Sequence, residues 1–396
     1  TRLATRMAVV RPSAIRDLLR LGAEPGIISF GGGYPDASIF PLDQLGEVYA
    51  TAIAEHGRES LQYTVPNGIP RLREQLAARM ARDGMPCTAD EVLILQGAQQ
   101  GLDLVAKLLV DPGDVIVTEN PTFLGGLIAF NPCEPRYATV RIDDGGMDMD
   151  DLERVLAATP GARLLYTVPD FQNPTGVTLA AERRPRLLEL ARRHDLVVLE
   201  DSPYREIRYE GEAAPTLRSL DVDGRVIHLG SFSKILAPGM RLGWAVASEE
   251  LIEQLGLLKV AADTQCSTLN MHAASAFLER YDVDAHIRTI RETYRRKKRL
   301  MVDAIRAGFP EGVSCTDPSG GLFTWLTFPE GFDAARFMLE HALPEARVAY
   351  VPGGTFFPVH EEAHHARLSY ASQPDDAIER GIAALGALLR AHGVGA

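Results

Sequence analysis

Between about residues 90 and 250, short apolar runs alternate with longer amphipathic segments, and few folds accommodate such a pattern. The runs are EVLILQG, DVIVTEN, ARLLYTVPD, DLVVLEDS, RVIHLGS and RLGWAVAS. A strand that helices cover on both faces has a near-continuous apolar sequence, whereas a half-exposed strand alternates. Segments such as QQGLDLVAKLLV and DMDDLERVLAAT lie between the runs and carry apolar residues at helical spacing. The pattern predicts an α/β fold built on a mainly parallel sheet.

A second unit is predicted near residue 280, because the pattern changes after about residue 250. A long charged helical segment, AHIRTIRETYRRKKRLMVDAIRAG, is followed by GGLFTWLTF and HARLSYA, which indicate strands. A chain of 396 residues also exceeds the size at which a single hydrophobic core stops growing. We therefore expect two domains, the second a smaller α+β unit.

The charge balance argues against a nucleic-acid partner, since 41 Lys and Arg residues stand against 53 Asp and Glu residues, a formal net charge of −12. The basic cluster YRRKKR falls on an amphipathic helix, so we interpret it as a solvated face rather than a nucleic-acid patch. No stretch approaches ~18 consecutive apolar residues, and the start lacks the long apolar region of a secretory signal. We expect a cytoplasmic protein with no membrane partner.

The four cysteines are far apart in the sequence, at Cys87, Cys133, Cys266 and Cys315. Their spacing fits neither paired metal ligands nor a dense disulfide scaffold. We expect reduced thiols and no metal site.

Polar residues that follow buried strands mark the place where an open α/β sheet binds its ligands. Four strand ends carry such residues, in QGAQQ, PDFQNPTG, EDSPY and GSFSK. Lys234 lies in the last of these, and desolvation at such a place lowers the pKa of a lysine and makes its amine a nucleophile that can form an imine with an aldehyde. The alternative is an ordinary lysine whose amine reaches solvent from a loop.

Two further strand ends offer partners for an aromatic ring. Asp201 in EDSPY can pair with a pyridine nitrogen and keep it protonated, so that the ring withdraws electrons. Alternatively, Asp201 caps a helix or forms an ion pair. Tyr204 and Asn173 offer a hydroxyl and an amide that can bond a phenolate oxygen on the same ring.

The segment QGAQQGL has a glycine between a strand and a helix. The backbone N–H groups of Ala98 and Gln99 would then point from a helix N-terminus at an anion such as a phosphate. Ser231, Ser233 and Arg241 can supply further donors. The alternative is a tight turn that binds no ligand.

The motifs SFSKILAPGMRLGW, QNPTG, EDSPYRE and GAQQGLDL resemble those of the class I/II aminotransferases, the pyridoxal-phosphate (PLP) enzymes of fold type I. The resemblance extends over essentially the whole chain, through FGGGYPDASIFP, LQYTVPNGIPRLRE, GGLFTW and ARLSYA. The most similar branch holds the 2-aminoadipate, kynurenine and aromatic or branched-chain aminotransferases. The fold that it implies has three parts: an N-terminal arm over residues 1–45 that contributes to the small domain and covers the active site, a large cofactor-binding domain over residues 46–280 with a mainly parallel seven-stranded sheet, and a small α+β domain over residues 281–396.

The resemblance also implies roles for single residues at a cofactor site. Lys234 would be the Schiff-base lysine and general base, and Asp201 would pair with the pyridinium nitrogen. Asn173 and Tyr204 would bond the ring oxygen. Phe123 falls where the family stacks an aromatic ring, often tyrosine, on the cofactor, so the stacking is kept and the hydroxyl is lost. The remaining cofactor contacts would come from Ala98, Gln99, Ser231, Ser233, Arg241 and Tyr63.

Tyr63 matches a tyrosine that reaches the phosphate in the neighbouring subunit, which implies a homodimer with shared active sites. Arg367 matches the arginine that clamps the substrate α-carboxylate, a task suited to a planar bidentate donor. Without the resemblance it would be a surface arginine at a strand start. Asn173 and a backbone contact from Gly33 would complete the substrate site.

Arg16 lies in PSAIRDLLRLG, which is expected to form a short helix with Ser13 as N-cap and Gly22 as its end. In the 2-aminoadipate branch a matching helix lies over the site, and its arginine binds acidic side chains or swings away for apolar ones. The resemblance thus implies that Arg16 pairs with glutamate or 2-aminoadipate. The alternative is a solvated arginine.

The predicted activity is ping-pong transfer of an amino group, by way of pyridoxamine phosphate, from an acidic, aromatic or branched L-amino acid to a 2-oxo acid such as 2-oxoglutarate. One alternative is another PLP enzyme of this fold, a β-lyase, decarboxylase or racemase, because the motifs fix the cofactor more firmly than the reaction. A second is a PLP-binding sensor module of a transcription regulator. We expect neither that module nor DNA binding, since about thirty residues precede FGGGYP and the charge is acidic.

Overall fold

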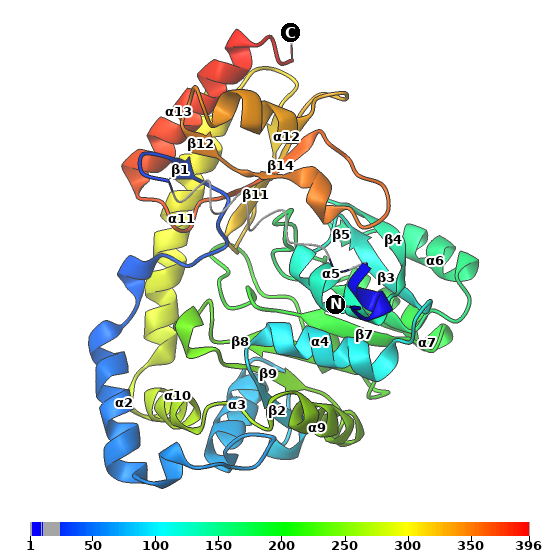
Figure 1. The fold of residues 1–396 in the computed structure, drawn as a ribbon, viewed down its shortest axis with the longest axis vertical. Helices are drawn as coiled ribbons and strands as arrows, with labels where there is room; N and C mark the ends of the chain where they lie inside the picture. Colours follow the sequence, from blue (N-terminus) through cyan, green and yellow to red (C-terminus); the bar gives the residue numbers. More distant parts are fainter. Residues whose placement is uncertain (1, 9, 11–23, 396) are drawn as a thin grey trace.

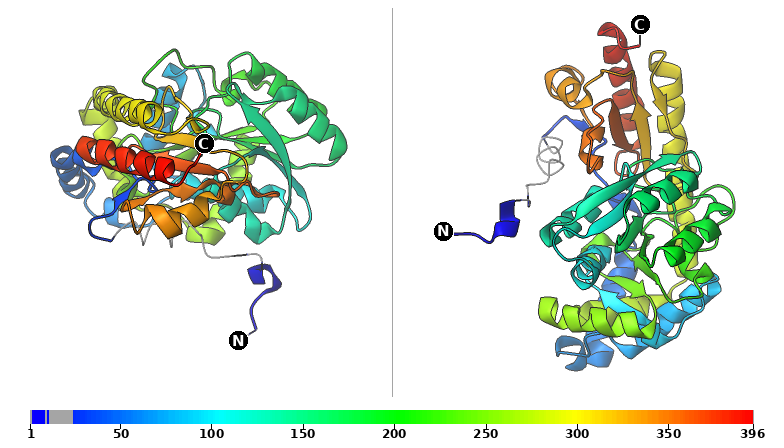
Figure 2. Two further views of the ribbon diagram at one scale, coloured as in Figure 1. Left: turned by 90° about the horizontal axis from the view of Figure 1, so that it is seen from above. Right: turned by 90° about the vertical axis from the view of Figure 1, so that its right-hand side faces the viewer.

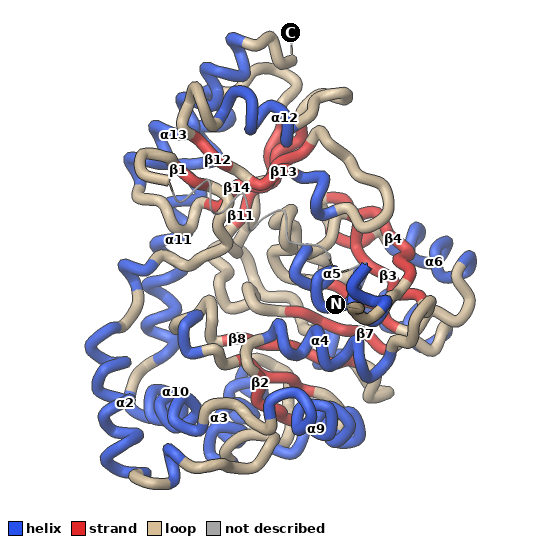
Figure 3. Tube along the Cα trace, viewed as in Figure 1, coloured by secondary structure: helices blue, strands red, loops and turns tan. Residues whose placement is uncertain are grey.

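The computed structural model of the protein describes residues 2–8, 10 and 24–395. Most of its strands form an eight-stranded sheet and a four-stranded sheet. Figure 3 shows the strands of the smaller sheet above those of the larger one. A two-stranded pair, β1 (Ile28–Ser29) with β12 (Val348–Ala349), lies beside the smaller sheet (Figure 1).

The eight-stranded sheet is mainly parallel, as the apolar runs predict. Only β9 and β5 run antiparallel to their neighbours, and every other pair is parallel. The carboxyl ends of the parallel strands therefore meet along one edge of the sheet. In spatial order the strands are β2 (Val92–Leu95), β9 (Gly243–Val246), β8 (Val226–Ser231), β7 (Val197–Asp201), β6 (Leu164–Thr167), β3 (Val115–Asn120), β4 (Arg136–Asp143) and β5 (Gly146–Met147).

Helices cover both faces of this sheet, which explains why its central strands are apolar along their length. Leu199 and Leu229 face α4, α5 and α9, whereas Val198 and Val226 face α6, α7 and α8. A third cluster packs Trp244 between the sheet and α2, α3 and α10. The helices are α2 (Leu42–His56), α3 (Pro70–Arg82), α4 (Ala98–Leu109), α5 (Leu124–Phe130), α6 (Met149–Ala158), α7 (Arg183–Arg193), α8 (Leu217–Leu220), α9 (Glu249–Asp263) and α10 (Thr268–Arg280).

The smaller unit is built from the C-terminal part of the chain together with the N-terminal strand β1. Its sheet is antiparallel, and α11 and α13 run side by side along it (Figure 2). The long helix α11 begins beside the large sheet and reaches the top of the smaller unit (Figure 1). These elements are α11 (Val283–Gly308), β10 (Ser314–Cys315), β11 (Phe323–Thr327), α12 (Ala334–Phe337), β13 (Val351–Pro352), β14 (His365–Ser369) and α13 (Asp375–Ala391).

The large sheet has eight strands where seven were expected, because the two-residue strand β5 extends its edge. The four cysteines are free thiols, as expected. No helix within the described ranges is both long and apolar enough to span a lipid bilayer.

The interpretation of YRRKKR as a solvated face is wrong for its two lysines. Lys297 and Lys298 are buried on α11. Lys297 Nζ lies 2.5 Å from Asp36 Oδ2 and also donates to two backbone carbonyls, and Lys298 Nζ lies 2.7 Å from Asp317 Oδ1. Both lysines lie on the face of α11 that packs inward and therefore form internal ion pairs, whereas Arg296 and Arg299 of the same segment are exposed.

Candidate active site

Lys234 lies in the turn after β8, at the carboxyl edge of the large sheet. Its side chain is half-buried, and Nζ donates a hydrogen bond of 2.8 Å to the carbonyl oxygen of Gly33. Burial, together with the positive charges of Arg367 and Arg241, lowers the pKa of this amine to about 8. The amine is thus hydrogen-bonded at the sheet edge, whereas the alternative was an amine that reaches solvent from a loop.

Asp201 is the last residue of the neighbouring strand β7 and is buried. Its Oδ2 accepts a hydrogen bond of 3.0 Å from the hydroxyl of Tyr166, whereas its buried Oδ1 has no partner among the described residues. Burial raises the pKa of Asp201 to about 6, against smaller lowering effects of the Tyr166 hydrogen bond and the charge of His228. A buried acceptor without a donor is costly unless a ligand supplies the donor.

Asn173, Tyr204 and Arg367 form one connected group. Asn173 Nδ2 donates to the hydroxyl of Tyr204 at 3.1 Å, and Arg367 donates to Asn173 Oδ1 at 2.9 Å and to the carbonyl of Gly31 at 2.8 Å. Arg367 is buried on β14 and lies 4.2 Å from the ring centroid of Phe323. Its Nε has no partner among the described residues, so the guanidinium keeps a donor for a further anion.

The N-terminus of α4 lies beside Arg241. Gly97, the residue before the helix, has φ +73° and no side chain to cap it. A Cβ at Gly97 would lie 2.7 Å from an Arg241 nitrogen, so the guanidinium sits directly over this turn. The amides of Ala98 and Gln99 have no intrahelical acceptor, and together with Arg241 they form a place for an anion.

Other predicted residues lie around this turn. Phe123 precedes α5, and its ring and the Gln99 side chain both pack over Gly125. Ser231 ends β8, and its hydroxyl accepts a hydrogen bond of 3.1 Å from the amide of Ser233. Ser231 thus ends the strand that Ser233, Lys234 and Arg241 follow.

Tyr63 is not brought to the site within a single chain. Tyr63 is 80% exposed, and no hydrogen bond or ion pair joins its side chain to the other predicted residues in the part of the chain that the structure describes. Arg16, and the helix expected around it, lie outside the described residues.

Two residues of the site were missed from the sequence. Tyr166 lies within β6 and donates a hydrogen bond to Asp201. In the sequence LLYT it is indistinguishable from the other buried residues of an apolar strand. Phe323 stacks against Arg367 and packs edge-on against Tyr204 at 5.8 Å. The pairing of β6 with β7 could have indicated Tyr166, since it aligns with Leu199, two residues before Asp201 on the same face.

Three features fit pyridoxal 5′-phosphate, the cofactor that the resemblance implies. Lys234 supplies an amine with a lowered pKa for an aldehyde. The unpartnered Oδ1 of Asp201 can accept from a ring N–H, and the α4 N-terminus with Arg241 suits a phosphate. A sheet covered by helices on both faces, with these groups at its carboxyl edge, defines the class of fold type I PLP-dependent enzymes.

Comparisons with known proteins agree. A family profile described as "Aminotransferase class I and II" matches residues 34–385. An aromatic-amino-acid aminotransferase of Thermococcus litoralis is 39% identical over 378 residues, which cover 94% of this chain and 90% of that protein. A 2-aminoadipate transaminase of Thermus thermophilus is 38% identical over 385 residues, 96% of this chain and 94% of that protein. The crystal structure of a kynurenine aminotransferase of Pyrococcus horikoshii superposes with a TM-score of 0.94 at 36% identity, over 98% of this chain and 97% of that one.

The chain therefore belongs to the class I and II aminotransferases, and it is an enzyme that transfers amino groups between small molecules.

Proposed function

We propose that this enzyme uses PLP to move the amino group of an acidic, aromatic or branched L-amino acid to a 2-oxo acid such as 2-oxoglutarate. The observation that carries the proposal is the meeting of Lys234 and the Arg367–Asn173–Tyr204 group at one edge of the sheet. Lys234 supplies an amine, and Arg367 supplies a cation that can bind an anion beside it. Bound PLP supplies an aldehyde that carries the amino group and a ring that withdraws electrons from the substrate.

Residues at the sheet edge would hold the cofactor. Lys234 would bind its aldehyde, Asp201 would pair with the ring nitrogen, and Asn173 and Tyr204 would bond the ring oxygen. Phe123 would stack on the ring. The phosphate would be held by the Ala98 and Gln99 amides, Ser231, Ser233 and Arg241.

Lys234 then acts as the base that takes up and returns the substrate Cα proton. With a pKa of about 8 it has about 300-fold more neutral amine at neutral pH than the ordinary value of 10.5 allows. In the cofactor-free protein the hydrogen bond to the Gly33 carbonyl holds Nζ in one position at the sheet edge.

Arg367 binds the substrate α-carboxylate. Burial lowers its pKa to about 10, so the guanidinium remains charged at neutral pH. Its surroundings are apolar, because the rings of Phe323 and Phe356 lie 4.2 and 5.2 Å from the guanidinium carbon. An ion pair formed there excludes water and is stronger than one at the surface. Gly33, whose carbonyl accepts a hydrogen bond from Lys234 Nζ, would add a backbone contact to the substrate.

The class of amino acid that donates the amino group is proposed from the named relatives and from Arg16. The named relatives act on aromatic amino acids, 2-aminoadipate and kynurenine. Arg16 would pair with an acidic donor side chain and leave room for an apolar one when it swings away. This gives one site that accepts both classes.

We also propose a homodimer in which Tyr63 reaches the partner's phosphate site. The exposure of Tyr63, with Leu61 and Val65 beside it, supports a contact with another copy.

The proposed division into an arm over residues 1–45, a large domain over 46–280 and a small domain over 281–396 is supported by the separation of the eight-stranded sheet from the four-stranded sheet. Limited proteolysis that cuts mainly away from residues 45 and 280 would contradict the division.

A donor screen tests the proposed reaction. The purified protein is mixed with glutamate, 2-aminoadipate, or an aromatic or branched amino acid, with 2-oxoglutarate as acceptor (pyruvate when glutamate is the donor). The expected result is loss of the donor with equimolar formation of its 2-oxo acid. Release of CO₂ or racemised amino acid without a new 2-oxo acid would refute amino transfer.

The same screen tests the proposed role of Arg16. The Arg16→Ala variant should lower kcat/KM for acidic donors alone, and equal losses on acidic and aromatic donors would refute the role of Arg16.

A further inference from the structure

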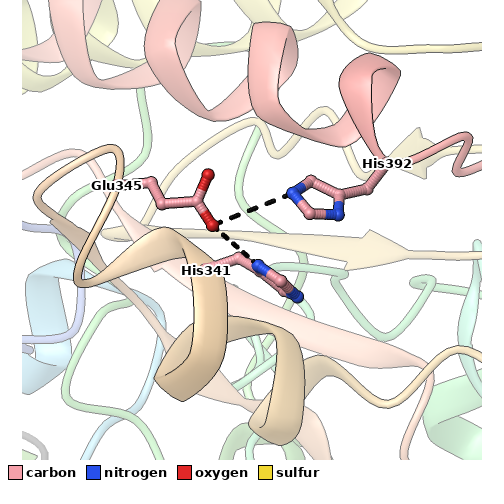
Figure 4. A group of neighbouring side chains, drawn as sticks. All are labelled: His341, Glu345 and His392. Atoms are coloured by element: carbon pink, nitrogen blue, oxygen red, sulfur yellow. Dashed lines mark hydrogen bonds and ion pairs between the residues drawn. The ribbon is translucent and has the colours of Figure 1, made fainter.

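A cluster of two histidines and a glutamate lies at the outer end of the smaller unit. His341 is in the π-helical turn η7 (Met338–Ala342) that continues α12, Glu345 follows four residues later, and His392 is the C-cap of α13. Figure 4 shows both imidazole rings directed at one oxygen of the glutamate from separate helices. The cluster therefore joins two elements that are distant in the sequence.

The distances are close to those of a metal site. His341 Nδ1 lies 2.8 Å and His392 Nε2 lies 3.9 Å from Glu345 Oε1, and all three ligand atoms lie within 4.8 Å of one another. Two ligand atoms on a tetrahedral zinc ion, each about 2.1 Å from it, lie about 3.4 Å apart, which is between these two distances. Small side-chain rotations would thus place all three atoms around one ion.

The two imidazole rings lie close together, 4.0 Å apart between centroids. The Phe337 ring packs against both of them, with its centroid 5.3 Å from that of His341 and 5.7 Å from that of His392. The two rings and the Glu345 carboxylate are therefore already gathered at one place.

We propose that His341, Glu345 and His392 bind a divalent transition-metal ion such as Zn²⁺, with water completing the coordination. Two imidazole nitrogens and one carboxylate oxygen select such ions over Mg²⁺ and Ca²⁺. The ion would link η7 to the end of α13. It would stabilise the smaller unit without taking part in amino transfer, because none of the proposed catalytic residues belongs to these elements.

A second cluster, of Glu362, His364 and His365, is a poorer candidate. His365 is buried and stacks on Trp325 at 5.2 Å, and its Nδ1 lies 3.2 Å from the hydroxyl of Thr327. Its ring is therefore held by other contacts. The experiment must nevertheless distinguish the two clusters, so it relies on substitutions at the first.

The test is calorimetric titration of the holoenzyme with ZnCl₂, comparing the wild type with His392→Ala and Glu345→Gln. The matched control is His194→Ala, which removes the histidine that forms the C-cap of α7. We expect the first two variants to lose the tightest zinc site or to bind it at least about tenfold more weakly, while the control binds as the wild type does. Zinc should also raise the Tm of the wild type and the control, and of neither cluster variant. Equal zinc affinity and an equal Tm rise in wild type and cluster variants would overturn the proposal, whatever their activity.

Discussion

Lys234 and Asp201 are two ionisable residues at one buried edge of the sheet, and burial shifts the pKa of each in opposite directions. The pKa of the lysine falls to about 8, and that of the aspartate rises to about 6. Both values lie near neutral pH, so that a neutral amine and a charged carboxylate are available together. The sheet edge thus supplies a nucleophile and a partner for a cationic ring from ordinary residues.

The pKa of Lys234 predicts how cofactor uptake depends on pH. In the cofactor-free protein the uptake rate should rise with pH and reach half its maximum near 8, because only the neutral amine reacts. Stopped-flow absorbance after mixing with PLP measures this rate. Arg367→Met should move the midpoint to higher pH, since the charge of Arg367 lowers the pKa of Lys234. A wild-type midpoint near the ordinary 10.5 would contradict the prediction.

Single residues were predictable from the sequence where a motif fixes them to a strand end. Lys234 and Asp201 follow buried runs, and the structure places both at the sheet edge. Arg367 could be assigned only by resemblance, because its meeting with Asn173 depends on how the second sheet packs against the first. Tyr166 was missed since a buried tyrosine in an apolar strand gives no sign of its hydroxyl partner.

At the scale of elements, α4 is held close to β9 by glycine. A Cβ at Gly243 would lie 2.8 Å from the amide nitrogen of Ala98 and 2.8 Å from the carbonyl oxygen of Gly230. Both are backbone atoms and cannot rotate away as a side chain can. The close contact places the α4 N-terminus next to the end of β8, where Lys234 follows.

Gly243→Ala should therefore destabilise the protein and weaken phosphate binding. The added methyl must displace α4 or β9, at a cost of about 1–3 kcal/mol in the free energy of unfolding. Chemical denaturation and PLP titration of the cofactor-free protein measure the two effects. Gly239→Ala is the control, since a Cβ there has no atom within 4 Å. Unchanged PLP affinity in Gly243→Ala would show that this contact does not position the helix.

The strands with near-continuous apolar runs were predicted from the sequence. Strand β4 was not. Its sequence, RYATVRID, is mostly exposed or half-exposed, because it lies near the edge of the sheet. β1 escaped prediction for a different reason. It has two residues, and only its pairing with β12, far along the chain, makes it a strand.

At the scale of the whole molecule, the active site needs both sheets. Arg367 from the small sheet bonds Asn173, which follows a strand of the large sheet. The segment that carries Gly33 is tied to α11 by the Lys297–Asp36 ion pair. The two-unit organisation was predictable from the change in pattern, whereas these ties were not, since they join residues with no common motif.

The proposed homodimer with shared sites predicts complementation between inactive variants. Tyr63→Ala spoils the partner's site and Lys234→Ala spoils its own, so a mixed dimer keeps one intact site. After the two variants are unfolded and refolded together, activity should return to about a quarter of the wild-type value, as random pairing of protomers requires. Each variant refolded alone is the control. No recovery, in a mixture that contains mixed dimers, would contradict the proposed role of Tyr63.

The central claim is that the Lys234 amine holds the cofactor. Borohydride reduction of the holoprotein, followed by peptide mapping by mass spectrometry, tests it directly. We expect one pyridoxyl-phosphate group, on the peptide that contains Lys234, and no label on any other lysine. A label on a different lysine, or a reduced holoprotein with Lys234 unmodified, would contradict it.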